Sequence, residues 1–484
     1  MKEISQNKTG IFIAIIALIG LILRVFAFID IPDLYGDEAS LAFNLFDRSI
    51  LEYFIPLNFG QAAPPLFLIF TKFFTLFIKN FEYSLRLIPF VSSILALFAF
   101  YFLSKKFFTK DISIAAAFTL FCLNIKLLAY SVVFKQYVSD VLIYILILLS
   151  YFYLDFDKKD KKFYGLLVFY ALSIWFSFPA MFAFAGVFLL KFIQSKNIKN
   201  LLYAVPFIIS FILFYIFEHH LNSSQMLHIY WTNGFINYNL SNFSTVLNSI
   251  IAWFFQFPVL KILFTVLFIL GLAFALKDFK CEKNQLKVIL FIIAVALSYL
   301  HIYPLSSRVS LYILPLLVII GASFFEYIDY SSKFKKYAVL IFAFLIITAS
   351  ILPVLKNYIF KLNYIERIET VLGTSKSLMN NGDILYIPME SINTAKFYLR
   401  EKPGVYNFKN VKFENMGDKD KISLDEYVKR LNSLESGHTY YYIFCHHTKK
   451  PQMLNKLYLW AKDKKDFKIY ADNVTFDALI IFSL

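Results

Sequence analysis

The fold class is decided near the start of the chain, where residues 11–40 read IFIAIIALIGLILRVFAFIDIPDLYGDEAS. The run from Ile11 to Ile29 is long enough to cross ~30 Å of hydrocarbon as a helix. It lacks a small-residue cleavage site and exceeds the apolar region of a signal peptide, so we expect a retained membrane helix. Acidic side chains follow this run at once, at Asp33, Asp37 and Glu38. The stretch therefore predicts a membrane protein with polar chemistry just beyond its first span.

The composition extends this prediction to the whole chain. Of its 484 residues, 59% are hydrophobic and only 17% are charged, and the mean hydropathy is +0.62. Soluble domains average about half apolar and about a quarter charged residues, so lipid is the expected solvent. The formal charge of +15 lies mostly in short Lys-rich connections, where a membrane surface explains it better than nucleic acid does. We expect a multi-pass integral membrane protein, with membrane lipid and no nucleic acid among its partners.

Apolar runs of spanning length recur along most of the chain. We predict about eleven transmembrane helices, at residues 11–30, 83–103, 111–130, 139–155, 163–177, 179–193, 199–218, 258–276, 287–303, 309–328 and 337–354. The Lys-bearing connections then all fall on one side, at 105–110, 158–162, 191–199, 277–287 and 333–336. The positive-inside rule makes that side cytoplasmic and places the N-terminus there. The apolar segment 65–78 is too short to span, and we expect it to lie at the outer interface.

This topology places the first loop (residues 31–64), the loop 219–258 and the whole tail outside the cytoplasm. The expected location is the plasma (inner) membrane of a bacterium. The tail, residues 356–484, is polar, with helical stretches at 364–379, 395–400, 424–434 and 453–462 and apolar strands at 384–387, 440–445 and 478–482. That pattern predicts a small extracytoplasmic α/β domain with a largely parallel sheet, following a transmembrane domain of residues 1–355.

The sequence contains no recognisable metal-binding pattern. Cys122, Cys281 and Cys445 stand in unrelated places, and the pairs His219-His220 and His446-His447 belong to no zinc motif. One Asp-Glu dipeptide without further carboxylates makes a poor Mg²⁺ site. We therefore predict no cofactor and no metal ligand, with a divalent cation near the paired acids as the open alternative.

Ionisable side chains at membrane depth are costly, so each one is a functional candidate. Asp37 and Glu38 lie at the start of an expected helix, where they either cap it or serve as a base near the membrane surface. The second group of candidates comprises Arg24, Arg86, Lys135, Tyr137 and Arg308. A cation near a helix end is equally well explained by a side chain that only reaches toward the interface. Acids and cations together on one face suit the displacement of a sugar from a lipid phosphate.

At these residues the chain resembles the GT-C glycosyltransferases, in particular the family 39-like group of protein O-mannosyltransferases and lipid A aminoarabinose transferases. The resemblance covers roughly residues 10–330 and is carried by Asp37-Glu38, Pro64-Pro65-Leu66, Arg86-Leu87-Ile88-Pro89, Lys135-Gln136-Tyr137 and Arg308. In this comparison Asp37 matches the catalytic acid and Arg86 matches a conserved arginine. The chain departs from the pattern at Gln61-Ala62-Ala63, where a His or Lys is common, and at Lys135, where an arginine is common.

The resemblance implies transfer of a sugar from a polyprenyl-phosphate donor to a hydroxyl on the outer face, with inversion at the anomeric carbon. The expected acceptor is a lipid, glycan or protein of the cell envelope. A secondary transporter or flippase of lipid-linked substrates is the main alternative, although the sequence shows no internal repeat of the kind that transporters carry. A receptor or assembly protein anchored by the membrane helices is the other alternative.

Overall fold

The computed structural model describes residues 2–219, 231–328, 348, 352, 367–388, 391–414, 424–444, 451–471 and 478–484. Its contacts divide the chain into two compact units. The membrane unit comprises Met1–Asp30, Arg48–Leu57 and Ala62–Lys356, and the C-terminal unit comprises Ile31–Asp47, Asn58–Gln61 and Asn357–Leu484. The expected span 337–354 lies outside the described residues except for 348 and 352, as do residues 220–230, 333–336 and 445–447.

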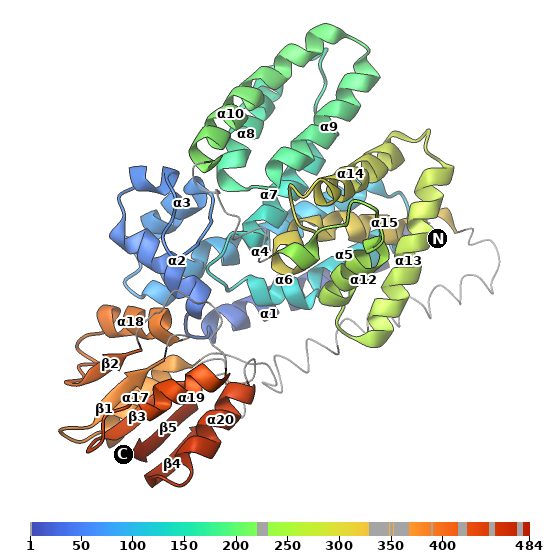
Figure 1. The fold of residues 1–484 in the computed structure, drawn as a ribbon. Coiled ribbons are helices and arrows are strands. Elements are labelled where there is room, and N and C mark those ends of the chain that lie inside the picture. Colours follow the sequence, from blue (N-terminus) through green and yellow to red (C-terminus); the bar gives the residue numbers. More distant parts are fainter. Residues whose placement is uncertain are drawn as a thin grey trace. The chain divides into compact units, whose positions relative to one another are not determined.

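The membrane unit is built of helices (Figure 1). Five segments of its described part are long and apolar enough to cross a membrane: Thr9–Ile29 in α1 (Lys2–Ile29), α4 (Phe81–Phe107), Ile198–Ile216 in η2 (Ile198–Ala204) and α10 (Val205–His219), α13 (Pro258–Lys277), and Ser307–Tyr327 in η4 (Ser307–Ile313) and α15 (Leu314–Tyr327). The other elements are η1 (Leu51–Phe54), α3 (Pro65–Thr75), α5 (Asp111–Cys122), α6 (Ile125–Tyr130), α7 (Tyr137–Ser150), α8 (Lys161–Phe176), α9 (Ala180–Ser195), η3 (Thr232–Gly234), α12 (Phe243–Phe254) and α14 (Glu282–Tyr299). These helices confirm a polytopic α-helical membrane protein, while the number of spans stays a prediction.

Local sequence signals set where several helices begin. Asp160 caps α8 by accepting a hydrogen bond from the Phe163 N–H at 2.9 Å, which satisfies a group that a helix start leaves unpaired. Pro65 and Pro258 stand at the start of α3 and α13, where the missing N–H of proline costs nothing.

The membrane helices differ in how much of their surface is covered. The apolar window in η4 and α15 is 83% buried, whereas the window in α1 is 22% buried. The α15 segment is therefore a central element, and α1 presents most of its apolar surface outward. α13 and α15 approach closely where Gly271 faces the Ile320 carbonyl. Glycine permits this approach, since a Cβ at position 271 would collide with the carbonyl oxygen.

The expected span 111–130 is wrong as a single helix, because the chain divides it into α5 and α6 at Asn124. The Asn124 side chain accepts hydrogen bonds from the backbone N–H groups two and three residues further on, at 3.0 and 3.3 Å, and donates to the Phe254 carbonyl at 3.2 Å. An asparagine that satisfies the following N–H groups starts a new helix. A prediction from hydropathy alone misses this break.

Two short helices, α3 and α12, lie in segments for which we predicted no transmembrane helix. α3 has 11 residues, about 16 Å, which is too short to cross the hydrocarbon core, and the place of residues 65–78 at the outer interface stays a prediction. α12 lies inside the predicted loop 219–258 and was not expected. Its buried residues are Val246, Ile250, Ile251 and Phe254, and helical spacing places them on one side.

The C-terminal unit combines a five-stranded sheet with helices (Figure 1). In chain order it contains α2 (Gly36–Asp47), α17 (Ile368–Leu378), β1 (Ile384–Ile387), α18 (Ile392–Glu401), β2 (Val411–Phe413), α19 (Leu424–Asn432), β3 (Thr439–Phe444), α20 (Pro451–Ala461), β4 (Lys465–Ala471) and β5 (Ala478–Ser483). The strand order is β2-β1-β3-β5-β4. β1 pairs in parallel with β2 and β3, whereas β5 pairs antiparallel with β3 and β4. The small α/β fold is confirmed, but the sheet is mixed and not largely parallel.

Burial and edge position explain why the sequence pattern predicted neither the antiparallel pairing of β5 nor the strands β2 and β4. β5 is a central strand, and a strand buried on both faces shows a continuous apolar run whichever way it points. β2 and β4 lie at the edges and carry Lys412, Lys465 and Lys468. Lysines on edge strands discourage pairing with other chains, and they also interrupt the apolar pattern that marks a strand. On one face, the central strands pack with Leu431 of α19 and Leu457 of α20.

Candidate active site

The predicted acidic pair lies in the first turn of α2, within the C-terminal unit. Glu38 is 1% exposed, and its Oε2 accepts a hydrogen bond from the Tyr35 N–H at 3.4 Å. The Glu38 N–H in turn donates to the Tyr35 carbonyl at 2.9 Å. This reciprocal pair resembles a capping box, in which a glutamate side chain closes the start of its own helix. Asp37 is partly exposed, so the two neighbouring carboxylates have different surroundings.

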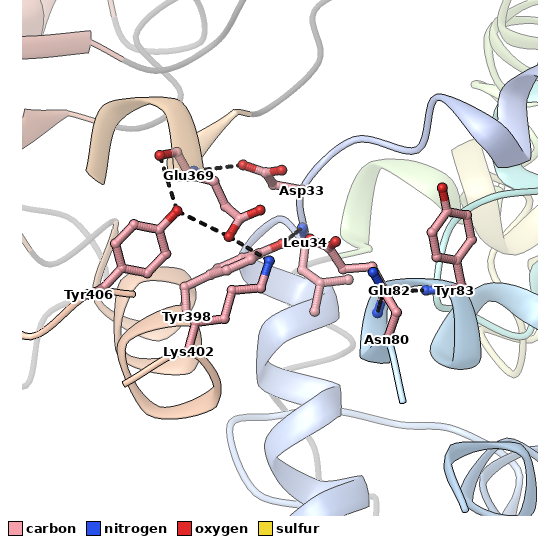
Figure 2. Close-up of polar contacts among 9 residues, drawn as sticks. All are labelled: Asp33, Leu34, Asn80, Glu82, Tyr83, Glu369, Tyr398, Lys402 and Tyr406. Carbon is pink, nitrogen blue, oxygen red and sulfur yellow. Dashed lines mark hydrogen bonds and ion pairs between the residues drawn. The ribbon is translucent and has the colours of Figure 1, made fainter. Parts of the chain in front are cut away.

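The turn before α2 is held by residues from the end of the chain (Figure 2). The Leu34 N–H donates to the Tyr398 hydroxyl at 2.8 Å, and Asp33 Oδ2 accepts from the Glu369 N–H at 2.7 Å. Lys402 forms an ion pair with Glu369 at 2.6 Å. Sequence reasoning missed these contacts, since the bonded residues are 364 and 336 positions apart and no spacing rule connects them.

Arg24 is buried in α1, with 1% of its surface exposed. Its Nη1 donates to the Gly20 carbonyl at 2.9 Å and to the Cys122 carbonyl at 3.2 Å. Cys122 is the last residue of α5, where the end of a helix favours a positive charge. A Cβ at Gly20 would collide with Cys122 Sγ, so glycine permits the close contact of α1 with α5. These contacts give Arg24 a role in helix packing.

Arg86 lies in the second turn of α4, and its side chain is fully buried, at 0% exposure. The start of this helix is fixed from both sides. Asn80 caps it by accepting from the N–H of Glu82 at 2.9 Å (Figure 2), and the Tyr83 hydroxyl donates to the Ile29 carbonyl at 3.1 Å. Arg86 thus lies in the interior of the protein, where a charge must be matched by its surroundings.

The structure brings two predicted donor-binding residues together. Arg308 on η4 lies with its Cζ 5.9 Å from the Tyr137 ring, at the start of α7, and 5.9 Å from the Trp231 ring. A guanidinium at this distance is attracted to the faces of aromatic rings. Tyr137 is 8% exposed, while Arg308 and Trp231 are half-buried. Lys135 is 5% exposed and lies in the turn that leads into α7.

Further aromatic residues extend this group. The Tyr130 ring lies 5.5 Å from Tyr137 and 5.8 Å from Trp253, and Lys126 Nζ lies 4.9 Å from the Trp253 ring. We call this set the basic–aromatic cluster: Lys126, Tyr130, Tyr137, Trp231, Trp253 and Arg308. Its two tryptophans were not predicted, and both stand in the predicted outer loop 219–258.

Asp140 is a buried carboxylate outside the predicted set. It lies one turn after Tyr137 on α7 and is 3% exposed, and its Oδ1 has no hydrogen-bond partner among the described residues. Tyr303 and Tyr312, whose rings are 5.7 Å apart, lie within electrostatic range of it. An acid this close to the start of an apolar helix is itself a signal of function.

Comparison with known proteins identifies the fold. No family model and no curated protein match the chain. The crystal structure of ArnT from Cupriavidus metallidurans in the apo state matches with a TM-score of 0.53 and 11% identity, over 99% of this chain and 98% of that chain. The structure of ArnT bound to undecaprenyl phosphate matches with a TM-score of 0.52 and 11% identity, over 98% of each chain. The Archaeoglobus fulgidus oligosaccharyltransferase in the apo form matches with a TM-score of 0.53 and 10% identity, over 96% of this chain and 73% of that chain. At such identities the likeness concerns architecture, and it confirms that the chain has the GT-C-like fold implied by the resemblance.

Proposed function

We propose that this protein is a membrane glycosyltransferase. It takes a sugar from a polyprenyl-phosphate carrier and transfers it, with inversion, to a hydroxyl group of a lipid, glycan or protein. The observation that carries the proposal is the first turn of α2, where Glu38 caps the helix and Asp37 stays partly exposed, in a chain with a GT-C-like fold. A structure of the same fold was solved with undecaprenyl phosphate, which supports a polyprenyl-linked donor.

Asp37 is assigned as the general base. The acceptor oxygen attacks the anomeric carbon from the face opposite the phosphate, and its proton passes to the Asp37 carboxylate. The bond between that carbon and the phosphate oxygen breaks, and its electron pair leaves with the phosphate. A phosphate leaves readily, so the barrier depends on the base and on neutralising the developing charge. Glu38 fixes the shape of the turn through its hydrogen bond to Tyr35.

The donor phosphate is assigned to cations of the membrane unit. Arg308 ranks first, because it is half-buried beside two aromatic rings and a guanidinium binds phosphate through two hydrogen bonds at once. Lys135 and Arg86 rank next, since both are buried charges near the ends of helices. Arg24 ranks last, because its guanidinium already donates to the carbonyls of α1 and α5.

The reaction is assigned to the extracytoplasmic face of a bacterial plasma membrane, with the N-terminus in the cytoplasm. The Lys-rich connections of the sequence support this orientation through the positive-inside rule. A lipid-borne sugar exposes its head group at the membrane surface, and α2 follows the first apolar helix directly.

Binding is tested with undecaprenyl phosphate on the full chain in lipid nanodiscs, with undecaprenol as the neutral control. We expect the phosphate lipid to bind and the alcohol not to bind, because the assigned cations recognise the charged group. Equal binding of the two lipids would contradict the assignment of the cations.

Transfer is tested with radiolabelled polyprenyl-phosphate sugars and, separately, nucleotide sugars, using a membrane extract as the source of acceptors. We expect label to leave the lipid phosphate only, with release of an equal amount of polyprenyl phosphate. Label transferred from nucleotide sugars would overturn the proposed donor. Movement of the intact donor across proteoliposomes without transfer would instead identify a flippase.

A further inference from the structure

The helix α18 runs beside α2 in the C-terminal unit and contacts it at regular intervals. We propose that α18 positions the acidic turn for catalysis, with Tyr398 and Asn393 as positioning residues for Asp37. This inference rests on the proposed function, because it assigns to these residues a part in the placement of the general base.

Tyr398 fixes the chain on one side of Asp37. Its hydroxyl accepts from the Leu34 N–H at 2.8 Å, and both residues are completely buried, at 0% exposure. A buried N–H must have a partner, so the position of Leu34 is tied to that of the tyrosine oxygen. Asp33, one residue earlier, accepts from the Glu369 N–H at the start of α17. The backbone that leads into Asp37 is therefore held by two hydrogen bonds from the last third of the chain.

Asn393 fixes the chain on the other side of Asp37. Its Nδ2 donates to Ser40 Oγ at 2.9 Å, and that hydroxyl donates to the Gly36 carbonyl at 2.6 Å. Ser40 is 4% exposed, so water competes little for these bonds. The carbonyl group directly before Asp37 is thus connected, through one serine, to α18.

The remainder of α2 continues the contact with α18. Successive contacts join Ser40 to Asn393, Phe43 to Phe397 and Asp47 to Arg400. The spacing of three and four residues on each helix is that of a single helical face, so the two helices lie along each other through these contacts. The phenylalanine rings are 5.5 Å apart, and the Arg400–Asp47 ion pair measures 2.7 Å at an exposed end.

The kinds of contact along the interface of α2 with α18 indicate that α18 positions Asp37. Apolar contacts such as Phe43 with Phe397 are enough to join two helices, yet the end that carries Asp37 is held by a buried hydrogen bond on one side and a part-buried one on the other. Hydrogen bonds constrain distance and direction more tightly than apolar packing does. A general base must be placed closely, since a displacement of about 1 Å can cost up to about 100-fold in rate.

The first test removes the tyrosine hydroxyl and separates its catalytic effect from its effect on stability. Tyr398→Phe is compared with Tyr441→Phe, which deletes a part-buried hydroxyl of β3 that donates to the Leu378 carbonyl at the end of α17 in the same unit. We expect Tyr398→Phe to lower kcat by about 10- to 100-fold with unchanged binding of undecaprenyl phosphate. Tyr441→Phe should lower the melting temperature to a similar extent and leave kcat near the wild-type value. Equal kcat in the wild type and Tyr398→Phe, or equal losses of kcat in both variants, would overturn the proposal.

The second test replaces the hydrogen bond by a covalent bond. The double variant Ser40→Cys, Asn393→Cys loses the contact when reduced and regains a fixed distance when oxidised. We expect turnover to fall in the reduced form and to rise again on disulfide formation. A disulfide that forms without any recovery of turnover would overturn the positioning role.

The proposed function and the positioning role of α18 are distinguished by the activity of the wild-type protein. A wild-type protein that transfers no sugar from any lipid-phosphate donor would overturn the proposed function and this inference together. An active wild type with an insensitive Tyr398→Phe would overturn this inference alone.

Discussion

The acidic turn of α2 and the basic–aromatic cluster are the two regions that the proposed reaction requires, and they are built in opposite ways. The turn is held by hydrogen bonds to residues that lie 336, 353 and 364 positions further along the chain. The cluster is held by contacts with aromatic rings, such as Tyr130 with Tyr137 at 5.5 Å and Tyr130 with Trp253 at 5.8 Å. Arg308 joins this group through ring faces 5.9 Å away.

This difference indicates how each region should respond to change. Hydrogen bonds specify atoms, so the acidic turn should be sensitive to the loss of a single oxygen or hydroxyl. A cation beside aromatic faces is attracted over a broad range of positions, so the cluster should tolerate an exchange of one aromatic ring for another. Proton transfer therefore depends on exact chemistry at a few atoms, and donor binding depends on charge and ring surface.

The largest effect should come from the acidic turn. Asp37→Asn keeps the size of the side chain and removes the basic oxygen, so turnover should fall by ~10²–10⁴-fold while donor binding is retained. The measurement is kcat for transfer alongside the affinity for undecaprenyl phosphate. Loss of donor binding in a folded Asp37→Asn protein would erase the distinction between the two regions.

The next largest effect should come from the cluster and appear in binding. Arg308→Ala removes charge-assisted hydrogen bonds, and the loss of even one, worth about 1.5–3 kcal/mol, should lower the affinity for undecaprenyl phosphate by about 10- to 100-fold. Arg400→Ala is the control, because Arg400 is an exposed arginine of the C-terminal unit and its loss should leave the affinity unchanged. Unchanged affinity in Arg308→Ala would remove this residue from the donor site.

Asp140 differs from the residues of both regions, because its replacement should raise the stability of the protein. Asp140 is buried, and when ionised its carboxylate carries a desolvation cost that a neutral amide avoids. Asp140→Asn should therefore raise the free energy of unfolding by about 1–3 kcal/mol and lower turnover, as expected for a functional residue kept at the expense of stability. Lower stability measured by thermal denaturation would show that Asp140 is paired in the folded protein.

The smallest effect should come from the second acid of the turn. Glu38→Gln keeps an oxygen that can accept from the Tyr35 N–H, so the capping contact survives and stability should change by less than about 1 kcal/mol. Turnover should stay within about tenfold of the wild type, since Glu38 is assigned no proton transfer. A loss in Glu38→Gln as large as that in Asp37→Asn, measured in the same assay, would assign the base to Glu38.

Much of this fold could be predicted because a membrane helix is marked by the apolar residues of its own segment, without reference to distant parts of the chain. The run from Ile11 to Ile29 is apolar except for Arg24, and the helix α13 is largely apolar apart from its lysines, so hydropathy locates both. The break at Asn124 was missed because a single capping side chain does not change the mean hydropathy of its neighbourhood. The strands β2 and β4 were missed because edge strands carry lysines in place of a regular apolar pattern.

The candidate site shows the same limit more strongly. Asp37 and Glu38 could be selected as candidates because they follow the first apolar run. Arg308 could be selected because it comes just before a later apolar run. Their surroundings could not, since the contacts of Tyr398 and Asn393 with the acidic turn depend on how the chain returns after more than 300 residues. Trp231 likewise meets Arg308 only in the folded chain.

Proton transfer and donor binding are separated by the rate of a single turnover at saturating donor, measured for Asp37→Asn and Arg308→Ala side by side. Excess donor should restore only part of the rate of Arg308→Ala, because this variant loses donor binding and also a charge that neutralises the leaving phosphate. Asp37→Asn should remain slower by ~10²–10⁴-fold, because its defect is in proton transfer. Transfer by Asp37→Asn at a near wild-type rate under these conditions would contradict the account.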